Sequence, residues 1–206
     1  MRSRSYIADE RALTTMAASQ GGYFTSKQAA AIGYTAPKRN YHVHVGNWVR
    51  ERRGIFRLST QPLPGRPDLV IWWLWSRNRQ DQPQGVYSHQ TALSLQELTD
   101  AMPSRFHMTV PRTFRRSAAI PKSVVLHMAN LSPSDIEHID GVPATKALRT
   151  LLDVAVSSAV PLPDLQLAFA EATRSGKITR AEIAAAKTDA AQRDVLRLLQ
   201  GKRGKR

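Results

Sequence analysis

The sequence predicts an α+β protein of two parts, an N-terminal winged helix-turn-helix followed by a mixed helical and β domain. Three short segments with helical periodicity come first, and two segments that alternate apolar and basic residues follow them. After a proline-rich break, helix-like and strand-like segments continue to the C-terminus. We therefore expect a DNA-binding domain at 1–60, an α+β domain at 68–200 and a basic disordered tail at 201–206.

The first part holds the helices and the hairpin of this motif. Gly21-Gly22 ends the first helix, and Thr25 caps a short second helix that ends at Gly33. Thr35 caps the third helix, and a proline fits its first turn. The expected helices cover residues 7–20, 25–33 and 36–45, and the expected strands cover 48–50 and 55–58 around a basic turn at 51–54.

The second part begins after the run from Pro62 to Pro67, which interrupts the pattern. Residues 140–143 form either a turn or a short strand. The expected helices cover 68–79, 88–98, 145–157, 164–173 and 180–199, with a break near Lys187, and the expected strands cover 106–110 and 123–128.

Composition narrows the class of function. The 206 residues are 42% hydrophobic, which is enough to build a core, and there is no cysteine for disulfides or thiolate metal sites. Thirty Lys and Arg face sixteen Asp and Glu, so the net charge is +14. Such an excess repels itself, and a polyanion would relieve it: nucleic acid, or alternatively an acidic membrane surface. No apolar run is long enough for a signal peptide or a membrane span, so we expect a cytoplasmic protein without membrane contact.

The charge points to the N-terminal part as the nucleic-acid interface. Residues 1–80 carry 13 basic and 4 acidic residues, whereas the remaining residues carry 17 and 12. In a helix-turn-helix the second helix of the motif lies in the major groove, and the wing contacts phosphate or the minor groove. We expect the stretch 35–47 to enter the groove. The expected base contacts are Lys38, Arg39, Tyr41 and His42, and the expected phosphate contacts are Asn47, Arg50, Arg52, Arg53 and Arg57. The alternative is that these charges are solvated on a small α+β domain.

A second basic group occurs between the two expected strands of the second part. It consists of Arg105, Arg112, Arg115 and Arg116, with His107 and Lys122 nearby. Such a group is typical of a surface that extends the contact with DNA or binds an RNA-like or acidic partner. It is equally typical of a solvated loop.

Several segments together resemble the AbiEi-type antitoxins. They are residues 22–33 (GYFTSKQAAAIG), 48–58 (WVRERRGIFRL), 87–93 (YSHQTAL), 106–111 (FHMTVP) and 141–153 (GVPATKALRTLLD). The resemblance covers most of residues 10–160 and rests on the order and spacing of these segments. It implies a winged-helix repressor of its own operon, paired with a nucleotidyltransferase-like toxin in a type IV toxin–antitoxin system. It also implies that the C-terminal domain contributes to neutralisation of the toxin.

No catalytic or metal-binding constellation stands out, so we expect neither an enzyme nor a cofactor. The six histidines are scattered, and His42 and His44 lie two residues apart on a helix, where they point to different sides. Arg149 and Asp153 have the spacing of an ion pair within a helix, which favours a structural role. Some proteins similar to the AbiEi type carry an endonuclease-like extension, but this chain lacks the acidic cluster that a metal-dependent nuclease needs.

Three tryptophans follow the proline-rich break. Trp72 and Trp75 share one face of the expected helix, which is typical of a core and less often of a dimer or toxin-binding surface. Taken together, the sequence predicts a sequence-specific repressor, most plausibly an antitoxin. The alternatives are a stand-alone DNA-binding regulator, a nuclease, and a protein-interaction module with an acidic partner. The sequence leaves the oligomeric state open.

Overall fold

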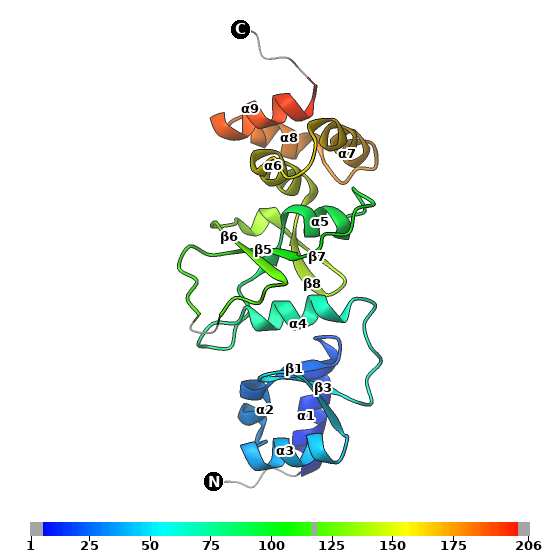
Figure 1. The fold of residues 1–206 in the computed structure, drawn as a ribbon, viewed down its shortest axis with the longest axis vertical. Coiled ribbons are helices and arrows are strands. Elements are labelled where there is room, and N and C mark those ends of the chain that lie inside the picture. Colours follow the sequence, from blue (N-terminus) through cyan, green and yellow to red (C-terminus); the bar gives the residue numbers. More distant parts are fainter. Residues whose placement is uncertain (1–5, 117–118, 202–206) are drawn as a thin grey trace. The chain divides into compact units, whose positions relative to one another are not determined.

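The computed structural model describes residues 6–116 and 119–201 and has mixed α and β structure, so the α+β prediction is confirmed (Figure 1). The chain divides into two compact units. The first unit extends to Gly85 and takes in Phe114–Arg116 and Asp140–Val142, and the second unit holds the rest. Most of the tail expected to be disordered, residues 202–206, lies outside the described residues.

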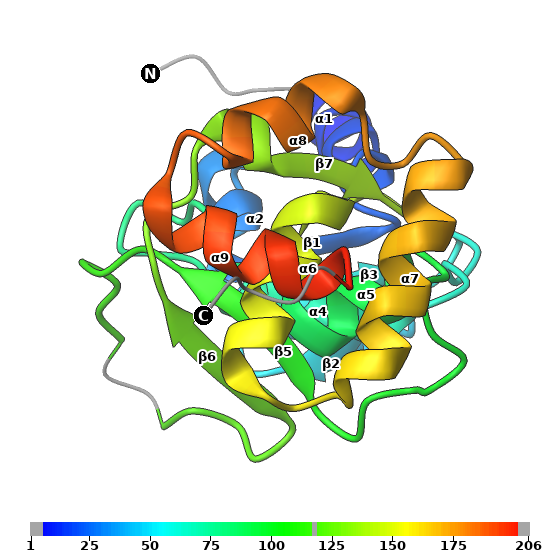
Figure 2. The same ribbon diagram turned by 90° about the horizontal axis from the view of Figure 1, so that it is seen from above.

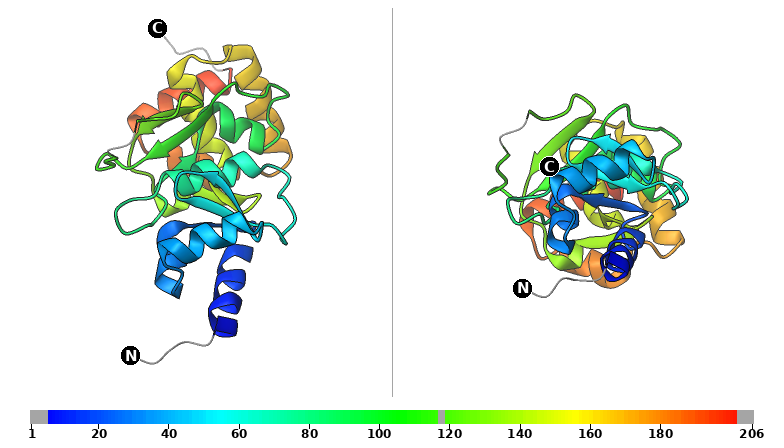
Figure 3. Two further views of the ribbon diagram at one scale, coloured as in Figure 1. Left: turned by 60° about the horizontal axis from the view of Figure 1, so that its bottom comes forward. Right: turned by 90° about the horizontal axis from the view of Figure 1, so that it is seen from below.

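The first unit consists of helices around a small antiparallel sheet (Figure 3). The sheet has the strand order β1-β3-β2, with Phe24 opposite Phe56 and Trp48 opposite Leu58. Strand β1 was not predicted from the sequence. The elements are α1 (Tyr6–Ala18), β1 (Tyr23–Thr25), α2 (Ser26–Ile32), α3 (Ala36–His44), β2 (Trp48–Arg52), β3 (Ile55–Leu58) and α4 (Pro67–Trp75).

Local signals in the sequence set the ends of α2 and α3. The Thr25 side chain accepts a hydrogen bond from the Gln28 backbone N–H, and the Gln28 side chain accepts one from the Thr25 N–H, which completes a capping box. Gly33 closes α2 with φ of 120°. Thr35 occupies the N-cap position of α3 as predicted, but its side chain makes no capping hydrogen bond, and Pro37 supplies the signal instead.

An aromatic cluster forms the core beneath α1, α2 and α3. The rings of Phe24 and Trp48 meet edge to face with centroids 4.8 Å apart, and Phe24 stacks on Phe56 at 5.8 Å. Leu13 and Ala17 of α1 are buried in the same cluster. Each large apolar side chain buried in this way contributes about 1.5–3 kcal/mol, so these residues fix how α3 and the β2–β3 hairpin lie on the sheet.

The β2–β3 hairpin is tighter than the sequence predicted. Strand β2 continues to Arg52, so the turn holds only Arg53 and Gly54, with a register irregularity between Arg50 and Arg52. Gly54 has φ of +76°, and a Cβ there would lie 2.9 Å from Nη2 of Arg77, which donates a hydrogen bond to the Gly54 carbonyl at 3.3 Å. A glycine is therefore required at the tip.

Helix α4 belongs to the first unit, whereas the sequence analysis placed its residues at the start of the second domain. Trp72 and Trp75 are 2% and 7% exposed, which agrees with the core interpretation of the tryptophans. An arginine lies over each of these two rings. The guanidinium carbon of Arg52 is 4.0 Å from the ring centroid of Trp72, and the guanidinium carbon of Arg116 is 4.6 Å from the ring centroid of Trp75. The helix ends at Trp75, earlier than predicted, because the Ser76 hydroxyl bonds the Trp73 carbonyl.

The second unit combines a mixed sheet with a layer of helices. In its described part the strand order is β6-β5-β4-β8-β7, with β5 parallel to β6 and antiparallel to β4. The strands are β4 (Val86–Tyr87), β5 (Phe106–Val110), β6 (Val124–Met128), β7 (Ile136–Ile139) and β8 (Val142–Thr145). The helices are α5 (His89–Leu95), the 3-10 turn Pro133–Asp135, α6 (Ala147–Ser157), α7 (Leu162–Arg174), α8 (Arg180–Ala186) and α9 (Ala190–Leu199).

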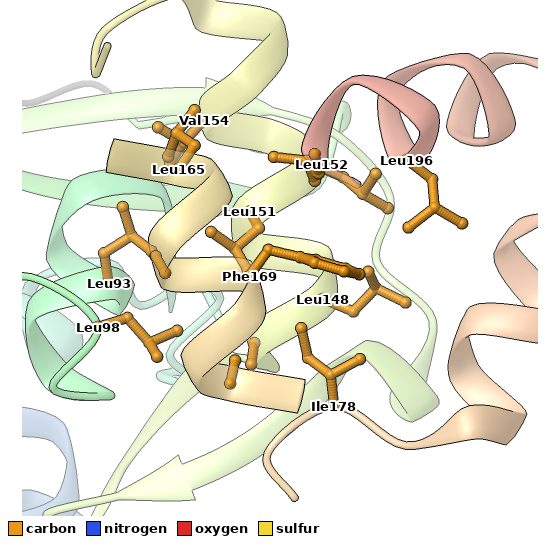
Figure 4. Close-up of a cluster of buried hydrophobic side chains, with 14 of the residues drawn as sticks. Leu93, Leu98, Leu148, Leu151, Leu152, Val154, Leu165, Phe169, Ile178 and Leu196 are labelled. Atoms are coloured by element: carbon orange, nitrogen blue, oxygen red, sulfur yellow. The ribbon is translucent and has the colours of Figure 1, made fainter. Parts of the chain in front are cut away.

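Helices α5, α6, α7 and α9 of this unit pack together (Figure 2). Their leucines meet in its core (Figure 4). Leu151 lies among Leu93, Leu165 and Phe169, and all four are nearly inaccessible to solvent. The break predicted near Lys187 is confirmed, because α8 ends at Ala186 and Asp189 caps α9 through the backbone N–H groups of its first turn. Among the residues that the structure describes, no helix is long and apolar enough to cross a membrane.

Candidate nucleic-acid interface

The inner face of α3 is set by His42. Its side chain is 7% exposed and stacks on Trp48 with ring centroids 4.8 Å apart and 14° between the ring planes. The ring also meets Tyr34 edge to face at 5.3 Å. Burial lowers the pKa of His42, so the ring is neutral at neutral pH. The expectation that His42 contacts bases therefore does not fit the structure, because the aromatic cluster holds its ring inside the unit.

The outer face of α3 follows from this register. Because successive helical residues are about 100° apart, Asn40 and His44 lie on the side opposite His42, and Tyr41 lies at the edge of that side. All three are exposed, and Tyr41 is 61% exposed although it is a large aromatic residue. Lys38 is also exposed, but it precedes His42 by four residues and lies on the same side of the helix as His42. Of the four expected base contacts, Lys38 and Tyr41 are thus at the surface, and sequence reasoning missed Asn40 and His44.

Arg39 supports the start of α3 and is only partly exposed. Its Nη1 donates a hydrogen bond to the Tyr34 carbonyl at 2.7 Å, which ties the helix to the turn before it. On the other side of the helix, Asn47 is exposed, and its amide nitrogen lies 3.2 Å from Nδ1 of His42. Both residues thus hold α3 in place within the free protein.

The β2–β3 hairpin adds further cations next to α3. Arg50 is exposed and its Nη2 donates to Oδ1 of Asn40 at 3.0 Å, so the hairpin and the helix are joined by this bond. Arg52 and Arg53 are exposed near the tip, where Arg52 lies on the Trp72 ring and Arg53 makes no hydrogen bond or ion pair with the described residues. These side chains remain available to an anion.

Arg57 does not fit the expected phosphate-binding role. Its side chain is 13% exposed, and its Nε pairs with Oε1 of Glu51 at 3.0 Å. Its Nη1 donates to the Leu58 carbonyl. Because Glu51 is the sole acidic residue in the sequence from Ala36 to Leu58, this pair neutralises the local carboxylate. The charged side chains that stay exposed on α3 and the hairpin are therefore all positive.

The second basic group is divided between the two units. Arg105 and Arg112 belong to the second unit and are exposed, whereas Arg115 and Arg116 belong to the first. Arg116 is partly buried over Trp75, and its Nη1 donates to the Arg77 carbonyl at 3.1 Å. The structure thus supplies a packing role for Arg116 against Trp75.

Comparisons with known proteins show the fold and leave the function open. No protein-family model matches the sequence, and no curated protein does. Among solved structures, the chain is similar to the RV2827C protein from Mycobacterium tuberculosis, with 14% sequence identity and a TM-score of 0.57. The match covers 100% of this chain and 84% of that one. At this identity the likeness concerns the fold alone.

Proposed function

We propose that the protein is a DNA-binding transcriptional repressor in which α3 enters the major groove. The order α1, β1, α2, α3, β2, β3 and the small sheet β1-β3-β2 match a winged helix-turn-helix, with the β2–β3 hairpin as the wing. The observation that carries the proposal is the uniformly positive exposed charge on α3 and the hairpin. Lys38, Arg50 and Arg53 lie on adjoining elements where a duplex backbone would run.

Exposed side chains of α3 are suited to contacts with base edges. Lys38 can donate to guanine, and the exposed ring of Tyr41 can contact a thymine methyl group. The Oδ1 of Asn40 already accepts from Arg50, so its amide N–H₂ remains to donate to an acceptor on a base. Arg50 therefore orients a base-contacting side chain and also lies within reach of phosphate.

The target of repression and the partner follow from the resemblance to AbiEi-type antitoxins. That resemblance supports repression of the protein's own operon and a nucleotidyltransferase-like toxin as its partner. A stand-alone regulator uses the same DNA-binding surface and differs only in the absence of a toxin. Co-purification of the chain with the product of a neighbouring toxin gene separates the two.

The test measures duplex affinity across a salt series by fluorescence anisotropy. The double variant Lys38→Glu with Arg53→Glu removes two exposed cations and leaves the Arg52–Trp72 contact intact. Because a lost phosphate contact lowers the salt slope by about 0.9, the loss of the Arg53 contact should lower the slope by about 1, and the loss of both cations should lower the affinity at least about tenfold at low salt. Lys187→Glu with Arg193→Glu makes the same change of charge at exposed positions of the second unit. Equal losses in both double variants would reject α3 and the hairpin as the interface.

A further inference from the structure

Three histidines of the second unit form one stacked cluster, which we call the histidine array. His89 begins α5, His107 lies on β5 and His127 lies on β6. Nδ1 of His107 is 3.0 Å from Nε2 of His127, and the His89 ring stacks on His127 with centroids 3.5 Å apart and 11° between the planes. The sequence indicated scattered histidines, and the fold brings these three together.

The backbone holds the array in place. Strands β5 and β6 pair in parallel with Thr109 opposite His127, and side-chain alternation puts His107 on the same face as Thr109. The Thr109 hydroxyl donates to Oγ of Ser88 at 2.8 Å, and that oxygen is 3.0 Å from Nδ1 of His89. His89 has φ of +51°, in the left-handed region that residues with a Cβ rarely adopt. Strained backbone at the start of α5 thus keeps its ring over His127.

Helix α6 supplies the charged groups beside the array. Nε of Arg149 lies 3.0 Å from both carboxylate oxygens of Asp153, as the spacing in the sequence predicted, and Nη1 of Arg149 is 3.6 Å from Asp135. A cavity of about 460 Å³ is lined by His89, His127, Arg149 and Asp153. Water in this cavity can deliver protons to the rings.

The folded structure favours the neutral form of the three rings over the protonated form. Burial lowers the pKa of His89 to about 3 and that of His107 to about 4, and nearby Arg149 and Arg105 act in the same direction. Burial also lowers the pKa of His127, although Asp153 opposes this change. The bond between His107 and His127 needs one ring as acceptor, so both cannot be protonated at once.

The arrangement does not favour a metal site. Because the His89 and His127 rings are stacked face to face, their nitrogens do not converge on one point. Within residues 6–116 and 119–201, no group of three or more His, Asp or Glu is arranged to hold a metal ion.

We propose that the histidine array is a proton-sensitive latch, which holds α5 against β5 and β6 while its rings are neutral and opens when they take up protons. An unfolded histidine has a pKa of about 6.5, above the values in the folded unit. The stabilising contribution is complete above about pH 6.5 and is lost as the pH falls toward 4. Burial raises the pKa of Asp153, which opposes this loss by one proton at most.

Hydrogen exchange of the full chain between pH 7.5 and 5 tests the latch, after correction for the intrinsic pH dependence of exchange. If opening takes up two protons, the opening equilibrium of α5, β5 and β6 rises about 100-fold per pH unit below pH 6. The triple variant His89→Gln, His107→Gln, His127→Gln keeps polar side chains that do not titrate, and it should remove this rise. His138→Gln, at an exposed position on β7, is the matched control and should leave the rise unchanged.

A second measurement covers the case in which the triple variant does not fold. Histidine NMR titration of the unaltered chain should show the array rings neutral at pH 5.5, with exposed His44 and His138 as reference signals outside the array. Single His→Gln variants assign the signals. Array rings that titrate near 6.5 without opening, or exchange in α5, β5 and β6 that does not change with pH, would overturn the proposal.

Discussion

Adjacent residues on α3 have opposite environments, which the sequence could not assign. Tyr41 is 61% exposed and His42 is 7% exposed. The helix is short and has few apolar residues, so its periodicity does not identify an inner face. Tyr34 and Trp48, which lie outside the helix, decide which side turns inward. Sequence reasoning could therefore identify the helix and its charge but not which of its side chains are exposed.

The contrast predicts different outcomes for two alanine substitutions. His42→Ala removes a ring that stacks on Trp48 and should lower the free energy of unfolding by about 2 kcal/mol. Tyr41→Ala removes an exposed ring and should change stability by less than about 0.5 kcal/mol while weakening duplex binding. Urea unfolding and anisotropy measure the two quantities. A His42→Ala variant that keeps its stability but loses its affinity for the duplex would instead indicate that His42 contacts DNA directly.

At the scale of elements, local sequence signals predicted helix starts, whereas several short strands were not predicted. The cap and proline of the sequence predicted the start of α3, and the break between α8 and α9 was also predicted. Strands β1, β4 and β7 were missed because each has two to four residues and is defined by pairing with distant segments. The β2–β3 hairpin was predicted with its turn too long, since a bulge extends β2.

Two threonine capping boxes in different surroundings give a prediction for helix starts. Thr25 of α2 is fully buried, and its hydroxyl also donates to Asp81, whereas Thr179 of α8 is exposed. Thr179→Ala should cost about 1 kcal/mol, as is typical of a lost N-cap. Thr25→Ala should lower the free energy of unfolding by about 2–3 kcal/mol, because the buried carboxylate of Asp81 also loses one hydrogen-bond partner. Urea unfolding compares them, with Thr25→Ser as the control that keeps the hydroxyl, and equal costs would contradict a role for Asp81.

For the whole molecule, composition and the proline-rich run did not predict the division of the chain into its two units. The proline-rich run suggested a boundary near Pro62, yet the first unit extends to Gly85. Helix α4 belongs to the first unit because of tertiary contacts between residues far apart in the sequence. Arg52 lies on Trp72, and Arg116 lies on Trp75. The histidine array is also formed by residues that are far apart in the sequence, and their spacing in the sequence does not predict it.

The net charge of +14 leads to a last prediction about where an anion binds. If the charge acts only as a diffuse attraction, heparin and a DNA duplex should protect the same broad set of backbone amides in both units. If α3 and the β2–β3 hairpin form the interface, a duplex at 100 times its Kd should stabilise the first unit by about 2.7 kcal/mol through linkage. Hydrogen exchange should then show protection centred on α3 and the hairpin with the duplex, and weaker, dispersed protection with heparin. Protection by the duplex confined to the second unit would place the interface elsewhere and would reject the groove-binding role of α3.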